Sequence, residues 1–323
     1  MLLAACCSFT GASVADSKIR FETEDGVVHH GAYVGGNRAR LLAVGVDVAS
    51  SVGPWALGTE TVTIKRLLAP IEKPSAIYAI GLNYWGHINA THIAAPQTPS
   101  LFFKNAAAFN DPFSSVVIPT LKAPNGTSWP SRPDYEGELA VVLKPGGCKD
   151  VSMDDALSCV QGYTLCHDVS MRCFQSTEGG ACPGNGGQFS FSKGLDTHAP
   201  IGPSLVSASA LGDGSGLTLT THVNGALRQK VSTSELVYGV KAILSFISQG
   251  TTLAGGSVIC TGTPDGVGDT MSPKTYLHAG DKVDIAIPQI GTLSNPVSFG
   301  AAGDAIAPES LDEYLPIAKI REV

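Results

Sequence analysis

The sequence predicts a β-rich α+β fold, with one large domain preceded by a small N-terminal one. Three observations lead to this prediction. The chain has 323 residues, which is long enough to bury an extensive core. Its 37 glycines and 20 prolines require many turns, and this favours short strands over a helical bundle. The hydrophobic fraction of 43% and the charged fraction of 15% are typical of a globular protein.

Short strand-like runs between glycines fill the first part of the chain. Ile19 to Phe21 and Val62 to Ile64 are examples. We therefore expect a small N-terminal domain over residues 1–70, whose apolar start at 1–7 is a frayed end or a short strand, and a linker from Pro70 to Pro74. The large domain is expected over 75–300 and a C-terminal extension over 301–323.

Two helices are expected in the large domain. Ser152 can cap the first, which carries acidic residues in its first turn and runs to about Gly162. The second begins near Ser232 and ends before Gly250. Its apolar residues recur at helical spacing, which predicts a stripe facing the core.

A hairpin and a late strand are predicted by local patterns. Residues 217–221 alternate between apolar and polar and are followed by Asn224-Gly225, the strongest short signal for a hairpin turn. Val283, Ile285 and Ile287 alternate in the same way, as in a half-buried strand. The glycine-rich run at 179–187 lacks a Gly-Lys-Ser/Thr ending, so it predicts a flexible loop rather than a phosphate site.

Charge and cysteine usage exclude several classes of partner. The formal net charge of −7, without a basic stretch, argues against nucleic acid. No segment approaches the ~20 apolar residues of a membrane-spanning helix. A local basic pocket for a small acidic substrate is compatible with this charge balance.

The eight cysteines form no CxxC pair, so we expect all eight to be reduced in a cytoplasmic protein.

The stretch around Glu136 and Glu138 is the most informative part of the sequence. These two glutamates are two residues apart at the start of a run that continues Leu-Ala-Val-Val-Leu. On a strand both carboxylates point to the same face. Two like charges on a buried strand are costly unless a cation neutralises them. Carboxylate oxygens suit Mg²⁺ or Mn²⁺, so we predict a metal site; two free glutamates on a solvated edge are the alternative.

Asp168 and Arg172 extend this prediction. A strand-like run ends in His167-Asp168, and Asp168 can supply a third carboxylate to the metal while leaving positions for water and substrate. Arg172 can clamp a substrate carboxylate through two parallel hydrogen bonds. The alternatives are a turn cap for Asp168 and a surface salt bridge for Arg172.

Six stretches in this order resemble the fumarylacetoacetate hydrolase family over residues 75–299. They are Gly81-Leu82-Asn83-Tyr84-x-x-His87, Phe102-Phe103-Lys104, Tyr135-Glu136-Gly137-Glu138-Leu139, Asp168-Val169-Ser170-x-Arg172, Ser192-Lys193-Gly194-Leu195-Asp196-x-x-Ala199-Pro200-Ile201-Gly202-Pro203 and Thr261-Gly262-Thr263-Pro264-x-Gly266-Val267-Gly268. Each stretch is modest alone, but the order and spacing together are specific.

The resemblance implies a mixed β-sandwich roll of the family's C-terminal type and a homodimer. It also implies one Mg²⁺ or Mn²⁺ held by Glu136, Glu138 and Asp168. Family members cleave carbon–carbon bonds in acylpyruvates and related dioxo acids, and some decarboxylate oxaloacetate or isomerise dienoates. A small oxo acid is therefore the expected substrate, and hydrolytic C–C cleavage of an acylpyruvate-like compound is the first expectation.

The resemblance also assigns roles to single residues. Lys193 matches the family's active-site lysine, and a cation beside the metal would stabilise a developing enolate. The candidate catalytic residues are His87, Lys193 and Arg172. The candidate substrate-binding residues are Lys104, Tyr84, Gln175 and Thr263.

One position departs from the family's pattern. In the hydrolases the histidine is followed three residues later by a glutamate that orients it, whereas this chain has Ala90 three residues after His87. His92 could replace the missing partner if this segment is a short helix. Decarboxylation or tautomerisation of an oxo acid needs no activated water and is the first alternative to hydrolysis. A ligand-binding relative without turnover is the second.

Overall fold

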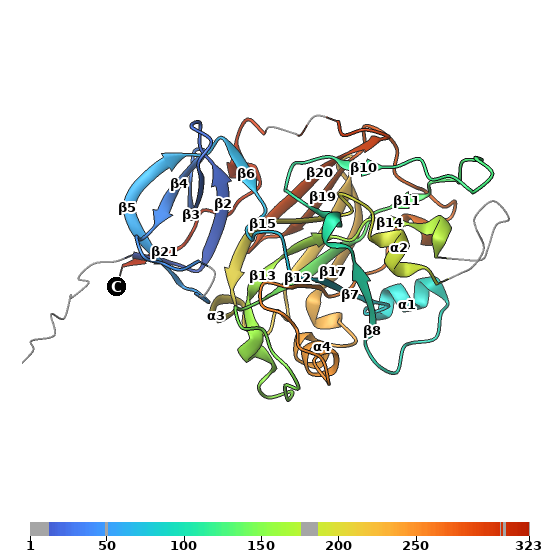
Figure 1. Ribbon diagram of the computed structural model, residues 1–323, viewed down its shortest axis with the longest axis horizontal. Helices are drawn as coiled ribbons and strands as arrows, with labels where there is room; N and C mark the ends of the chain where they lie inside the picture. The colour runs from blue at the N-terminus through green and yellow to red at the C-terminus, as the bar shows by residue number, and fades with distance from the viewer. Residues whose placement is uncertain (1–12, 49–50, 176–186, 304, 306–307, 323) are drawn as a thin grey trace, which may run out of the picture.

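The β-rich α+β prediction is confirmed by the computed structural model, which describes residues 13–48, 51–175, 187–303, 305 and 308–322. The described strands form one 14-stranded sheet, one 5-stranded sheet and one 2-stranded sheet. Figure 1 shows a smaller group of N-terminal strands beside a larger body. The frayed start expected at residues 1–7, and all but the last residue of the loop expected at 179–187, lie outside the described residues.

The N-terminal strands form one end of the large sheet. They are β1 (Ser13–Ala15), β2 (Ser17–Glu22), β3 (Val28–Gly35), β4 (Arg38–Leu42), β5 (Trp55–Thr63) and β6 (Arg66–Leu68). The last strand of the chain, β21 (Ile320–Glu322), pairs antiparallel with β1. The C-terminal residues therefore join the N-terminal strands in space, and the domain boundaries drawn from the sequence stay a prediction.

The strands that position the site form the other end of this sheet. They are β7 (Ile77–Gly81), β8 (Ser100–Lys104), β12 (Gly137–Leu143), β13 (Val160–His167), β15 (Ala199–Ser207) and β18 (Val258–Cys260). The spatial order is β15-β13-β12-β18-β7-β8. Every residue of β12, β13 and β15 is buried, because both faces of these strands are covered.

A second sheet packs on one face of the first. Its order is β10 (Val116–Ile118), β20 (Gly291–Phe299), β19 (Lys282–Ile287), β16 (Thr218–Val223) and β17 (Ala226–Ser232). The predicted hairpin is confirmed, with φ of 51° at Asn224 and 78° at Gly225. The predicted late strand is β19. Two short pairings complete the strands: β9 (Phe109–Asn110) with β15, and β11 (Pro133–Asp134) with β14 (Ser170–Met171).

The helices are shorter than the sequence suggests. They are α1 (Trp85–Thr91), α2 (Phe189–Lys193), α3 (Ala208–Leu211) and α4 (Val240–Ile247). Single 3₁₀ turns cover Ala106–Ala108, Ala156–Cys159, Arg172–Phe174, Thr233–Glu235, Gly268–Thr270 and Leu311–Glu313. The sequence analysis did not predict α1 and α2, which flank the site. It did not predict α3 either.

The prediction of a helix from Ser152 to Gly162 is correct only for its first residues. The Ser152 Oγ accepts the Asp155 N–H at 3.1 Å, as a cap does. Only one 3₁₀ turn follows, and at Val160 the chain enters β13, because this buried run pairs along its length with β12 and β15. Pairing across the sheet overrides the local helix signal.

The helix predicted from Ser232 to Gly250 is divided in two. Ser232 and Glu235 form a capping box around the turn Thr233–Glu235, and α4 begins only at Val240. Between them the N–H groups of Val237 and Tyr238 donate to Asn83, each at 2.9 Å. The predicted apolar stripe is buried in α4, at Val240, Ile243, Leu244 and Ile247.

The cysteine prediction needs one correction. Cys148, Cys159, Cys166 and Cys260 are free, but Cys173 is disulfide-bonded, so the expectation of eight reduced thiols is wrong. Spacing along the sequence tests only for CxxC pairs, whereas a disulfide requires closeness in space. Within the described ranges, no helix is long and apolar enough to cross a membrane.

Gly137, the first residue of β12, separates Glu136 from Glu138 and faces the second sheet. A Cβ added there would collide with the Thr221 Oγ1 and would lie 3.1 Å from the Ile285 Cγ2. We expect Gly137→Ala to lower the free energy of unfolding by about 1–3 kcal/mol, because overpacking forces the sheets apart. Thermal unfolding measures this. The control is Gly81→Ala on β7, where the nearest atom is 3.7 Å away; equal loss in both variants would contradict the prediction.

Candidate metal centre

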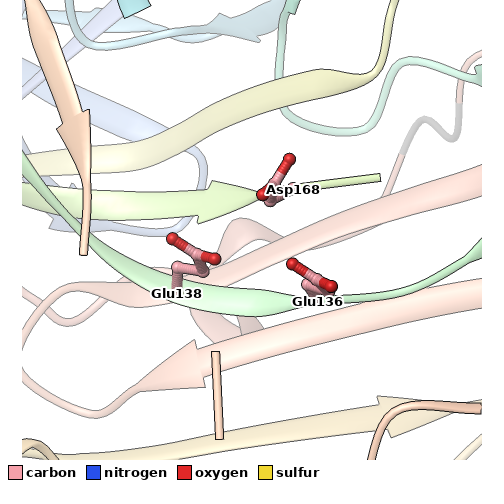
Figure 2. Close-up of side chains that lie close together, drawn as sticks. All are labelled: Glu136, Glu138 and Asp168. Carbon is pink, nitrogen blue, oxygen red and sulfur yellow. The ribbon is translucent and has the colours of Figure 1, made fainter. Parts of the chain in front are cut away.

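Three buried carboxylates meet at one end of the central strands. Glu136 lies directly before β12, Glu138 lies within it, and Asp168 follows the last residue of β13. One oxygen from each carboxylate lies within 4.8 Å of the others. Figure 2 shows the side chains of Glu136 and Glu138 on the same side of their strand, facing Asp168 on the neighbouring one.

The pairing of two strands fixes this arrangement. β12 and β13 run antiparallel with Gly137 opposite His167, so Glu136 and Asp168 lie side by side just beyond the ladder. The Asp168 N–H donates to the Glu136 carbonyl at 2.9 Å. A slip of one residue would turn Glu136 and Glu138 to the opposite face of the sheet.

Two buried lysines contact the carboxylates. The Lys193 Nζ lies 2.5 Å from the Glu136 Oε2 and 2.5 Å from the Asp168 Oδ2, and the Lys104 Nζ pairs with the Asp168 Oδ1. Burial opposes ionisation of Glu136, but Lys193 and Arg172 outweigh it and hold the pKa of this carboxyl below its usual range. Burial also opposes the charge on Lys193, yet Asp168 and Glu136 raise its pKa. Lys193 is therefore charged.

Glu138 differs from the other two carboxylates. Its Oε2 accepts the Gly262 N–H at 2.8 Å, and in the described part of the chain no lysine or arginine forms an ion pair with it. Burial, followed by the charges of Asp168 and Glu136, raises the pKa of Glu138 well above its usual value. A divalent cation would remove this conflict, and an all-oxygen donor set suits a hard cation. The residues present therefore fit a metal.

Arg172 organises the edge of the cluster. Its Nε donates to the Asp134 Oδ2 at 2.8 Å, its Nη1 donates to the Gln175 Oε1 at 2.9 Å, and its Nη2 lies 2.6 Å from the Glu136 Oε1. Protein groups thus contact all three nitrogens that were expected to clamp a substrate. Asp134 was not anticipated, although its spacing of two residues before Glu136 repeats the spacing between the glutamates.

A polar network surrounds the cluster. The Thr263 hydroxyl accepts from the Gln229 Nε2 at 2.8 Å and donates to the Gly137 carbonyl at 3.1 Å. Gln175 donates to the Ser192 Oγ at 2.9 Å, directly before Lys193. Tyr84 is buried at the start of α1. The structure thus places Thr263 and Gln175 in contact with the elements that carry the carboxylates and Lys193, and their role toward a substrate stays a prediction.

Comparison with known proteins agrees with this geometry. The fumarylacetoacetate hydrolase C-terminal domain matches residues 76–298. The chain belongs to the fumarylacetoacetate hydrolase family. The family resemblance seen in the sequence is therefore confirmed, and the chain belongs to a family of enzymes acting on small molecules.

Relatives within the family carry names of different reactions. The mitochondrial oxaloacetate tautomerase FAHD2B of Bos taurus is 34% identical over 255 residues, covering 78% of this chain and 76% of the relative. The oxaloacetate tautomerase YisK of Bacillus subtilis is 37% identical over 235 residues, covering 72% and 73%. The 2,4-didehydro-3-deoxy-L-rhamnonate hydrolase of a Sphingomonas strain is 37% identical over 261 residues, covering 80% and 84%.

A solved structure gives the same fold. The 2-hydroxyhepta-2,4-diene-1,7-dioate isomerase of Mycobacterium marinum superposes with a TM-score of 0.69 at 33% identity, covering 88% of this chain and 98% of that one. Tautomerase, hydrolase and isomerase names therefore all occur among relatives of similar identity, so the family alone does not decide the reaction.

His87, which the family resemblance makes a catalytic candidate, lies on α1 with Ala90 three residues later. His87 is buried, its Nδ1 has no hydrogen-bond partner in the described ranges, and burial lowers its pKa to about 4. Ala90 is half-buried on the same helix. His92 does not supply a replacement, because it ends the helix in a left-handed conformation, with φ of 55°, and is exposed.

Asp265 is the acidic residue that the sequence analysis missed. A Cβ added at Gly86 would collide with the Asp265 Oδ1, so this carboxylate lies directly against the first turn of α1, beside His87. Its charge acts to raise the pKa of His87, although burial and the nearby cations outweigh it. The signal available in the sequence was an acidic residue inside the family's Thr263-Pro264-x-Gly266 loop.

Arg172→Lys tests the role of the guanidinium. Lysine keeps the charge but cannot reach Asp134, Gln175 and Glu136 together. We expect the free energy of unfolding to fall by about 1.5–3 kcal/mol, because charged hydrogen bonds to Asp134 and Gln175 are lost. We also expect a higher KM, because Glu136 is then held less firmly. Steady-state kinetics over a substrate series measures this. If KM and kcat are both unchanged, Arg172 has only a structural role.

Proposed function

We propose that this protein is a divalent-metal-dependent tautomerase that interconverts the enol and keto forms of a small 2-oxo dicarboxylate of the oxaloacetate type. Glu136, Glu138 and Asp168 hold Mg²⁺ or Mn²⁺. The observation that carries the proposal is the buried cluster of three carboxylates and two lysines beside a histidine with alanine, not glutamate, three residues on. This set provides charge stabilisation without the family's means of activating water.

The metal and the lysines have complementary tasks. When bound, a divalent cation polarises the 2-oxo group and favours negative charge on its oxygen. Lys193 and Lys104 place two further positive charges at the same carboxylates, where they attract a dianionic substrate in a protein of net charge −7. Both lysines are almost completely buried, so water screens these charges little.

The reaction itself requires only proton movement. The enol hydroxyl loses its proton, the carbon next to the 2-oxo group gains one, and no carbon–carbon bond breaks. His87 is neutral near pH 7 because its pKa lies at about 4, so its imidazole can accept a proton at that pH. No water has to be activated, which is compatible with Ala90.

Hydrolysis of an acylpyruvate-like C–C bond, the first expectation from the sequence, is the second candidate. Asp265 favours it, because this carboxylate lies beside α1 and could orient His87 in place of the missing glutamate. The name of the Sphingomonas relative also supports it. Decarboxylation would require the same positive charges as tautomerisation. The two reactions can be distinguished because decarboxylation releases CO₂.

Three assays on one preparation decide among the reactions. Decay of enol absorbance in oxaloacetate reports tautomerisation, CO₂ release reports decarboxylation, and pyruvate release from an acylpyruvate reports hydrolysis. We expect only the first to be fast, and only with Mg²⁺ or Mn²⁺ present. Fast pyruvate release would overturn the tautomerase proposal. Metal binding with none of the three activities would indicate a ligand-binding relative without turnover.

Ala90→Glu tests the importance of the missing carboxylate. General base catalysis is worth about 10²–10⁴-fold, so returning a glutamate three residues after His87 should raise acylpyruvate hydrolysis within that range. Tautomerisation should stay the same or slow, because a negative charge is added near a dianionic substrate. Asn89→Glu, which places the same charge on the exposed side of α1, is the matched control. Wild-type hydrolysis that is already fast and gains nothing would show that another residue has the role, and Asp265→Asn would then test whether it is Asp265.

Assembly and location complete the proposal. A homodimer is proposed on the family resemblance, and analytical ultracentrifugation tests it. The cytoplasmic location expected from the sequence stays a prediction. The relatives compared include mitochondrial and bacterial proteins, so imaging in the native cell is the appropriate test.

A further inference from the structure

A cavity lies away from the carboxylates and is lined by residues of β2, β3, β12 and β13. Figure 1 shows β2 among the N-terminal strands and β12 and β13 in the central sheet. Its volume is about 710 Å³, within the range of small-molecule sites. Its walls include Ile71 and the partly exposed Val46 and Val48. Val142 and Leu143 of β12 also line it, although their side chains are fully buried. Val142 is four residues from Glu138 on β12, or roughly 13 Å at the usual strand rise, so this cavity is separate from the metal centre.

A buried lysine lines this cavity. Lys18 is 2% exposed, its Nζ donates to the Pro70 carbonyl at 3.0 Å, and it lies 5.6 Å from the centre of the Trp55 ring. No carboxylate of the described residues lies within 4.0 Å of this ammonium group. An ammonium has three donors, and only one has a protein acceptor among the residues described here. A buried cation without a counter-ion is costly.

Burial and a neighbouring arginine oppose the positive charge of Lys18. Burial lowers the pKa of Lys18 to about 7, and the neighbouring Arg20 lowers it further than Glu72 raises it. Burial likewise lowers the pKa of His30 to about 3, with Lys18 and Arg20 acting in the same direction. Asp47, Glu72 and Lys73 are exposed at the rim, and together they carry two negative charges and one positive charge. Lys18 and His30 are the ionisable groups farther inside, and Lys18 is the one of the two whose pKa of about 7 allows a positive charge near neutral pH.

We propose that this cavity binds a small organic carboxylate with an apolar body, whose carboxylate pairs with Lys18 and whose body packs on Val46, Val48 and Ile71. A carboxylate fits better than a phosphate, because one buried ammonium matches a single charge, whereas phosphate sites use several donors or paired arginines. Gln161 lines the cavity as well, and its amide already donates to the Ser51 carbonyl at 2.8 Å, so Lys18 is the principal donor.

Isothermal titration of the metal-loaded protein with hexanoate, benzoate and inorganic phosphate tests this site. We expect hexanoate or benzoate to bind once per chain, and Lys18→Met to weaken binding at least about tenfold, as for loss of a charged hydrogen bond. Lys73→Met at the exposed rim is the matched control and should change affinity by less than about fivefold. Val46→Trp, which reduces the volume of the cavity while Lys18 is kept, should abolish binding and covers the case in which Lys18→Met misfolds.

Several results would overturn the proposal. One is that neither carboxylate binds at concentrations up to about 10 mM, since a weaker affinity would not be that of a specific site. The second is that the Lys18→Met variant binds the carboxylates as tightly as the wild type. The third is that phosphate binds more tightly than either carboxylate. Glu138→Gln separates this site from the metal centre. Carboxylate binding that survives Glu138→Gln supports a second site, and binding lost with it would assign the titration to the metal centre. Failure here leaves the proposed tautomerase activity unaffected, because that activity is measured at Glu136, Glu138 and Asp168.

Discussion

Glu138→Gln is expected to remove metal binding and activity while making the metal-free protein more stable. Glu138 has no ion-pair partner among the described residues, so its charge has no compensation other than a metal. Its pKa is raised in the folded protein, which means that ionisation costs stability at any pH above the ordinary value of 4.5. Glutamine is nearly isosteric and neutral. We expect a gain of about 1–4 kcal/mol in the metal-free protein.

The loss of function in this variant should be large. Residues that only hold a metal ligand in place contribute about 10–100-fold to metal affinity. Loss of the ligand Glu138 itself should therefore lower metal affinity by more than about 100-fold. Turnover should fall by about 10³-fold, as several kcal/mol of charge stabilisation are lost. Thermal unfolding with chelator and with Mn²⁺ measures the effects on stability and metal binding, and enol-decay kinetics measures turnover. The variant should unfold at a higher temperature than wild type in chelator and gain nothing from Mn²⁺.

Glu136→Gln is the matched control, with an expected stability change of opposite sign. Glu136 pairs with Lys193 and contacts Arg172, so its removal leaves buried cations without compensation. Breaking such a pair costs about 3–5 kcal/mol. If both variants destabilise the metal-free protein equally, Glu138 is an ordinary structural carboxylate and its assignment as a ligand fails.

Lys193→Met is expected to lower kcat by about 10²–10³-fold, the usual loss when one preorganised donor at a developing oxyanion is removed. Lys193 lies 2.5 Å from an oxygen of both Glu136 and Asp168, so it is the cation most central to the cluster. Methionine is apolar and similar in length, and it removes only the ammonium group, whose Nζ lies 5.0 Å from the centre of the Phe102 ring. Enol-decay kinetics at saturating metal measures this loss.

Lys104→Met is the comparison for Lys193. Lys104 contacts only the Asp168 side of the cluster, so we expect a smaller loss in kcat and a larger rise in KM. Retained turnover in Lys193→Met at saturating metal would show that this lysine neutralises the carboxylates in the metal-free protein and takes no part in the reaction.

The sequence predicted the central part of the site because its signals were local and periodic. The spacing of Glu136 and Glu138 follows from the two-residue repeat of a strand, and β12 preserves it. Asp168 was located by the end of an apolar run, which is the end of β13. The position of each carboxylate on its strand follows from local geometry. Their closeness depends on the pairing of β12 with β13, which the family resemblance implied.

Features that depend on long-range contacts were missed. Asp265 reaches α1 from a loop far along the sequence, and only the absence of a Cβ at Gly86 permits the approach. Asn83 interrupts the helix expected after Ser232 by accepting hydrogen bonds from residues 237 and 238. The expected clamp Arg172 contacts Asp134, and no local pattern reports such a partner. Propensity and spacing cannot detect contacts that form only once the sheets have packed.

The most direct test of the central claim is metal removal and return, followed by enol decay of oxaloacetate. The account predicts that chelation abolishes acceleration, that Mg²⁺ or Mn²⁺ restores it at one equivalent per chain, and that Glu138→Gln is not restored by the same addition. Acceleration that persists after chelation, or that returns equally in the Glu138→Gln variant, would contradict a metal centre at Glu136, Glu138 and Asp168.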